Sequence, residues 1–116
     1  LRRANGKQKN KVLRVFDLQL DPTSHRTSIE EQPIEMGPTK FRLLKFFLLN
    51  QEKVFSRDHI QNSVWGANVY LEERTIDVHI RRLRKALSSV NNTAIDYSKL
   101  VQTVRGAGYR FSVRQA

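Results

Sequence analysis

The sequence predicts an α+β fold in which a small antiparallel sheet comes first, three helices follow and a β-hairpin ends the chain. Three patterns predict this order. Short β-rich runs separated by turn residues fill 12–35, apolar residues recur at helical spacing over 40–87, and a Gly-x-Gly turn near the C-terminus joins two alternating runs. The length of 116 residues suits one domain with a modest hydrophobic core.

The first eleven residues are polar and basic and show no periodicity. We interpret 1–11 as a linker or arm, so that the folded domain occupies 12–116. Strands are expected directly after it, at Val12–Phe16, Leu18–Leu20 and Arg26–Ile29. Turn residues separate these runs, and Pro33–Met36 follows a second turn. They predict a small antiparallel sheet.

Two helices are expected next. Gly37–Thr39 opens the first, with proline in its first turn and threonine as a possible cap, and Lys40–Leu49 carries a broad apolar face that belongs in the core. The second starts at Val54–Ser56 with Ser56 as its N-cap. It ends near Trp65–Gly66, because glycine commonly follows a helix C-terminus.

The third helix, Glu72–Leu87, has two different sides. One side carries the apolar residues Ile76, Ile80, Leu83 and Leu87. The opposite line carries Arg74, Val78, Arg81 and Lys85. A helix that mixes cations with a lone apolar side chain suits the base edges of a DNA major groove. A basic surface helix held by salt bridges is the alternative, and it is disfavoured because the exposed line carries no acid.

A polar loop, 88–99, and a β-hairpin complete the predicted fold. The hairpin comprises Leu100–Arg105, a turn at Gly106–Gly108 and Tyr109–Val113. Val104 and Phe111 suit the core, and Thr103, Arg105 and Arg110 remain available to a partner. A basic second helix of a helical pair, followed by a basic hairpin, describes a winged helix-turn-helix.

The charge also points to a polyanion partner. The chain holds 21 basic and 11 acidic residues, and the excess lies at 1–14, with six basic residues and no acid, and at 72–116, with nine basic and four acidic residues. Nucleic acid is the commonest polyanion, and a charge that only maintains solubility is the alternative. An anionic membrane is disfavoured, because no basic helix has a large aromatic face and no apolar run could span a bilayer.

The residues of common catalytic and metal sites are scattered or absent. His25, His59 and His79 lie on different expected elements, and the chain lacks cysteine and any glycine-rich phosphate loop. We therefore expect no enzyme, no metal and no cofactor. A protein-interaction module that shares the winged-helix shape without binding DNA is the alternative function.

Two segments carry a family resemblance. Thr75–Lys85 and Val104–Phe111 together resemble the signature of the OmpR/PhoB-type response-regulator effector domains, and the resemblance extends over 12–113. Met36–Leu44 and Val64–Tyr70 look closest to the phosphate-regulon branch of that family. The loop 88–99 is longer than in those relatives.

The resemblance implies a four-stranded N-terminal sheet, a three-helix bundle and a C-terminal hairpin wing. It implies that 1–11 is the remnant of a linker to a receiver domain that a sensor kinase phosphorylates. It also implies head-to-tail dimers on direct DNA repeats and activation of phosphate-starvation genes in the bacterial cytoplasm. RNA polymerase would be recruited through the sigma subunit.

The resemblance further assigns roles to individual residues. Residues near base edges would be Thr75, Asp77, Val78 and Arg82. Residues on phosphates would be Arg57, Trp65, Arg74, His79, Arg81, Arg84, Thr103 and Tyr109, with Arg105 in the minor groove. Residues facing the polymerase would be Asp58, Leu71 and Glu73. Three alternatives stay open: Asp77 can instead orient neighbouring arginines, Trp65 can belong to the core, and His79 can be an ordinary surface residue.

Overall fold

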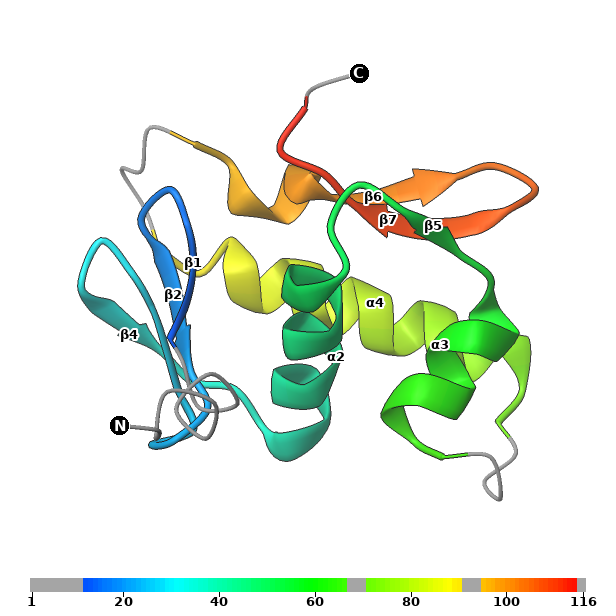
Figure 1. Cartoon of the computed structure of the whole chain (residues 1–116), viewed down its shortest axis with the longest axis horizontal. Helices are drawn as coiled ribbons and strands as arrows, with labels where there is room; N and C mark the ends of the chain where they lie inside the picture. The colour runs from blue at the N-terminus through cyan, green and yellow to red at the C-terminus, as the bar shows by residue number, and fades with distance from the viewer. Residues whose placement is uncertain (1–11, 67–70, 91–94, 115–116) are drawn as a thin grey trace, which may run out of the picture.

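Four short strands form the first layer of the structure (Figure 1). The computed structural model describes residues 12–66, 71–90 and 95–114, so the predicted arm at 1–11 and the centres of the loops at 67–70 and 91–94 lie outside the described residues. The strands are β1 (Leu13–Val15), β2 (Leu18–Asp21), β3 (Arg26–Ile29) and β4 (Gln32–Ile34). They pair in sequence order and antiparallel, which confirms the predicted sheet.

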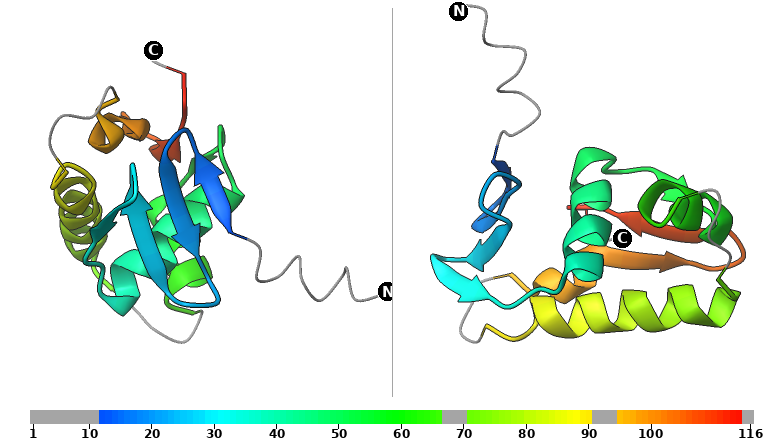
Figure 2. Two further views of the ribbon diagram at one scale, coloured as in Figure 1. Left: turned by 90° about the vertical axis from the view of Figure 1, so that its left-hand side faces the viewer. Right: turned by 90° about the horizontal axis from the view of Figure 1, so that it is seen from below.

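One face of this sheet is apolar because alternate residues of its strands point to the same side. Leu18 pairs with Ile29, and Leu20 with Thr27, and these four side chains are buried. They pack toward α2 (Pro38–Leu49), which lies between the sheet and the rest of the molecule (Figures 1 and 2).

Helix α2 forms the centre of the core. Its buried residues are Phe41, Leu43, Leu44, Phe47 and Leu48. Pro38 is in the first turn, as predicted, but the prediction that Thr39 caps the helix is wrong. Gly37 is the N-cap and no side chain bonds to the first turn, so the fixed φ of proline helps to start this helix.

Helices α3 (Arg57–Val64) and α4 (Glu73–Leu87) complete the bundle. The Ser56 hydroxyl accepts a hydrogen bond from the backbone N–H of His59 at 3.1 Å, which confirms the predicted cap. All four residues of the apolar side of α4 are at most 2% exposed. None of the described helices is long and apolar enough to cross a membrane.

The two residues before the Ser56 cap, which the prediction included in the start of the second helix, are not helical. Val54–Phe55 forms a short strand, β5, that pairs with β7 (Gly108–Phe111). The Phe55 ring lies edge-on to Phe46 of α2, with 4.9 Å between ring centroids. The pairing with β7, more than fifty residues along the chain, favours the extended conformation, and no local pattern in the sequence reveals it.

The predicted hairpin is confirmed as β6 (Val101–Val104) and β7, and the second sheet has the order β5-β7-β6. Phe111 is fully buried, as expected. Val104, expected in the core, is only half-buried, because it pairs with Gly108 next to the exposed turn of the hairpin.

The end of the polar loop also differs from the prediction. Residues Tyr97–Leu100 form a 3-10 helix, η1, whose N-cap Asp96 accepts a hydrogen bond from the Ser98 N–H. Tyr97 is 2% exposed. Its hydroxyl oxygen accepts a hydrogen bond from the backbone N–H of Asp17 at 2.9 Å. The loop therefore joins the C-terminal half of the chain to the turn between β1 and β2.

The approach of β5 to β7 generates a prediction about Gly108. A Cβ atom at this position would lie 2.0 Å from the carbonyl oxygen of Phe55, and the φ angle is +141°. We expect Gly108→Ala to lower the free energy of unfolding by about 2–4 kcal/mol, measured by urea denaturation.

Gly106→Ala is the matched control, because Gly106 also has a positive φ, +79°, but nothing within 4 Å of the added atom. It should cost about 1 kcal/mol. Equal losses in the two variants would show that β5 can move aside.

Candidate nucleic-acid interface

The side of α4 that faces away from the core carries exposed cations. Arg74, Arg81, Arg82 and Lys85 are exposed. None of the four has a salt bridge to another described side chain. Thr75 and Val78 are half-buried beside them. The mixture of donors and apolar groups that the sequence predicts is therefore presented to solvent.

The hairpin runs alongside α4 and forms a second edge of the same surface (Figures 1 and 2). Arg105 lies at its exposed tip and Thr103 on an exposed part of β6. Across the two strands, the Arg110 guanidinium donates two hydrogen bonds to Gln102 Oε1, at 3.0 and 2.7 Å. Arg110, expected to be available to a partner, thus serves to join the two strands.

Asp77 lies at the centre of a half-buried hydrogen-bond network that joins α3, α4 and β7. Arg57 at the start of α3 donates from Nε to Asp77 Oδ1 at 2.8 Å and from Nη2 to Oδ2 at 3.4 Å. The Tyr109 hydroxyl of β7 donates to the same Oδ1 atom. The Arg57 guanidinium also lies 5.6 Å from the centroid of the Tyr109 ring, within range of a cation–π contact.

This network fixes the charges of its members. The hydrogen bond from Arg57 lowers the pKa of Asp77, against the opposing effect of burial, and the bond from Tyr109 lowers it further. Burial raises the pKa of Tyr109, and its bond to Asp77 adds to that effect. At neutral pH the carboxylate is therefore charged and the phenol keeps its proton.

Arg84 makes a second connection between α4 and the hairpin. Its Nε donates to the Val101 carbonyl at 2.9 Å and its Nη2 to the Thr103 hydroxyl oxygen at 2.8 Å. Burial lowers the pKa of Arg84, but a guanidinium stays charged at any physiological pH. Thr103 accepts in this bond, so its own O–H can still donate to a partner.

Trp65 and His79 pack together at the other edge of α4. Their ring centroids are 5.0 Å apart, and both side chains are half-buried. The Nδ1 atom of His79 is buried and has no hydrogen-bond partner in the described part of the chain. Burial lowers the pKa of His79, and the charges of Arg82 and Lys40 lower it further. His79 is therefore a neutral hydrogen-bonding group at pH 7 rather than a cation.

The residues predicted to face a polymerase lie at the start of α3 and at the end of the connection from α3 to α4. Asp58 is exposed in the first turn of α3, and the backbone N–H of Leu71 donates to Gln61 Oε1 at 3.2 Å. Glu73 begins α4, and its side chain lies outside what is described. Sequence reasoning missed Gln61, a buried polar residue of α3. The one signal in the sequence is that it lies next to the apolar residues Ile60 and Val64 on the buried side of the helix.

Three predicted contact residues bond to protein groups in this structure. Tyr109 is 5% exposed, and its hydroxyl is held by Asp77 rather than presented to solvent. Asp77 orients Arg57, which is the alternative reading of its position, and Arg84 uses two of its donors on the hairpin. Their hydrogen bonds connect α4 to the hairpin.

The fold and this surface define a winged-helix domain. A family model described as "Transcriptional regulatory protein, C terminal" matches residues 31–111. The chain is 53% identical to the phosphate regulon transcriptional regulatory protein PhoB of Escherichia coli K12 and 54% identical to PhoB of Pseudomonas aeruginosa, in each case over 98% of this chain. It spans about half of these relatives, 48% and 47% of their lengths.

A solved structure of the DNA-binding domain of the response regulator AdeR, in complex with an intercistronic region, is also similar. It matches with a TM-score of 0.70 and 25% identity, over 86% of this chain and 98% of that chain. The chain therefore belongs to the C-terminal domains of transcriptional regulatory proteins, the OmpR/PhoB-type effector domains. This is a family of regulators and not of enzymes.

The Asp77 network generates a prediction about stability and pH. The folded pKa of Asp77 is lowered, so its stabilising effect is present above the unfolded value of about 4 and is lost as the pH falls through the folded value. We expect Asp77→Asn to lower the free energy of unfolding by about 1 kcal/mol at pH 7, because both partners are 37% exposed.

The measurement is urea denaturation of both proteins from pH 7 down to pH 2.5. The difference between them should shrink below about pH 4. A difference that is the same at every pH would contradict the assignment.

Proposed function

We propose that this domain binds duplex DNA in a sequence-specific manner and thereby regulates transcription. The observation that carries the proposal is the exposed face of α4, whose arginines have no carboxylate partner among the described residues. An α-helix of this kind fits the major groove of B-form DNA. The AdeR domain, a structural relative, was solved in complex with an intercistronic region.

Different residues of α4 would contact different parts of the duplex. Arg82, Thr75 and Val78 would face base edges, where a guanidinium suits guanine and a methyl-bearing side chain suits thymine. Arg74 and Arg81 would neutralise phosphates on either side. The neutral His79 and the indole N–H of Trp65 can donate to a phosphate without adding charge.

The hairpin would act as the wing. Arg105 is exposed at the tip beside a Gly-x-Gly turn, and an arginine at such a place can enter a narrow, electronegative minor groove. Thr103 would donate its hydroxyl to a phosphate. In this arrangement Asp77, Arg84 and Tyr109 position the contacting residues, and Arg57 would contact a phosphate while it holds Asp77.

The similarity to PhoB supports finer proposals. The whole protein would carry a receiver domain that a sensor kinase phosphorylates, with 1–11 as the linker. It would bind direct repeats as a head-to-tail dimer and activate phosphate-starvation genes in the cytoplasm. Asp58, Leu71 and Glu73 would contact the sigma subunit of RNA polymerase.

Salt dependence tests the DNA proposal against a protein-interaction module. With roughly six phosphate contacts, the logarithm of affinity should fall against the logarithm of salt concentration with a slope of about −5. The measurement is fluorescence anisotropy of labelled duplexes selected from a random pool. A slope near zero would reject the proposed interface.

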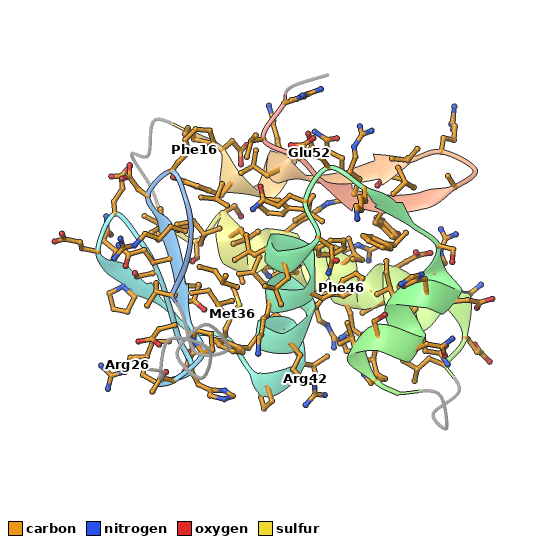
Figure 3. The ribbon with its side chains drawn as sticks, viewed as in Figure 1. Phe16, Arg26, Met36, Arg42, Phe46 and Glu52 are labelled. Atoms are coloured by element: carbon orange, nitrogen blue, oxygen red, sulfur yellow. The ribbon has the colours of Figure 1, made fainter. Side chains whose placement is uncertain are left out.

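Arg82→Ala, in the same assay, separates base contacts from phosphate contacts. It should weaken binding to the selected duplex by about 1–3 kcal/mol and relax the preference at one base pair. Arg26→Ala is the matched control, because Arg26 is exposed on β3, on the far side of α2 from α3 (Figure 3). It should leave binding unchanged.

The polymerase proposal is tested by Glu73→Lys in the whole regulator. Duplex binding should be retained, because Glu73 precedes the contacting face, while transcription from a target promoter in vitro should fall. Loss of duplex binding together with transcription would reject a separate polymerase contact.

A further inference from the structure

Helix α4 holds the hairpin at two separate points. Asp77 accepts a hydrogen bond from Tyr109 of β7, and Arg84 donates to Val101 and Thr103 of β6. Asp77 and Arg84 are seven residues apart, which places them on the same side of the helix and about 10 Å apart along its axis. Each strand of the hairpin is thus attached to a different turn of α4.

The two attachments share one aromatic ring. The Tyr109 ring centroid lies 5.6 Å from the Arg57 guanidinium and 5.8 Å from that of Arg84. Both guanidiniums are within the range of favourable cation–π contacts. A movement of the ring would therefore disturb both points of attachment at once.

Other contacts also hold the base of the hairpin. Val101 and Phe111 are 2% and 0% exposed and fix its base in the core, and β5 pairs along β7. Beyond that base, Arg105, Gly106 and Ala107 are exposed. The two contacts to α4, about 10 Å apart along the helix axis, add to these and restrict the direction of the outer part of the hairpin more than either contact would alone.

We propose that the Asp77–Tyr109 and Arg84–Thr103 contacts fix the direction of the wing, and so set the spacing along DNA between the base pairs that α4 reads and the minor-groove segment that Arg105 enters. Tyr109 and Arg84 are then positioning residues that determine specificity for spacing. This inference rests on the proposed DNA binding. It adds specificity for spacing, which no single contact residue could supply.

The first test needs no DNA. The chain has no cysteine, so Lys85→Cys on α4 and Ala107→Cys at the tip can carry a pair of spin labels, and electron–electron resonance gives their distance distribution. We expect a narrow distribution in the parent protein and a broader one after Tyr109→Phe with Arg84→Met. Circular dichroism establishes that the variants remain folded.

Gln102→Ala is the matched control. It removes the acceptor for Arg110 within the hairpin but no bond to α4, so its distribution should match that of the parent. An unchanged distribution in the Tyr109→Phe, Arg84→Met protein would overturn the proposal.

The second test uses duplexes whose A·T-rich minor-groove segment is moved by one base pair from the preferred position. The parent should lose roughly tenfold in affinity on the shifted duplex, and the Tyr109→Phe, Arg84→Met protein less than about threefold. An equal penalty in both proteins would overturn the proposal. If the parent binds no duplex, the proposed function fails, and the distance distribution alone still decides whether the contacts fix the wing.

Discussion

The burial of one side of α4 is the constraint on which the rest of the interface depends. Ile76, Ile80 and Leu83 are at most 1% exposed. Rotation of the helix would expose these side chains and lose the free energy of their burial, about 25 cal/mol per Å² of apolar surface. The helix therefore has one orientation, and the arginines opposite this stripe must face solvent. The core of the domain and its proposed contact surface are two results of a single periodicity.

The core also explains why α2 is so apolar. It contacts the four-stranded sheet on one side and the helices that carry the interface on the other (Figure 2), so two of its sides are covered, and Arg42 and Leu49 are exposed on what remains. The sheet in turn is joined to the C-terminal half by the bond from the Asp17 N–H to the Tyr97 hydroxyl. A displacement of the sheet would reach α4 through these contacts, because close-packed interiors transmit strain.

The sequence predicted those features that depend on local pattern. The strands at 13–34, the cap at Ser56, the apolar side of α4 and the hairpin all follow from periodicity, caps and turn residues. The role of Gln61 depends on Leu71, ten residues away across the connection between α3 and α4. The strand at Val54–Phe55 and the helical turn at Tyr97 depend on partners much farther along the chain. No pattern within a window of a dozen residues contains that information.

The same distinction explains which site residues the sequence placed well. Arg74, Arg81 and Arg82 are exposed because of helical period alone. Asp77 is different, because its partners are 20 and 32 residues away, and on the helix surface it is indistinguishable from a residue that could contact a base. Its carboxylate would repel the phosphates that the arginines attract, and pairing with Arg57 removes that penalty. The acid can therefore stay within a cationic face, where it holds the wing in place without weakening the attraction to DNA.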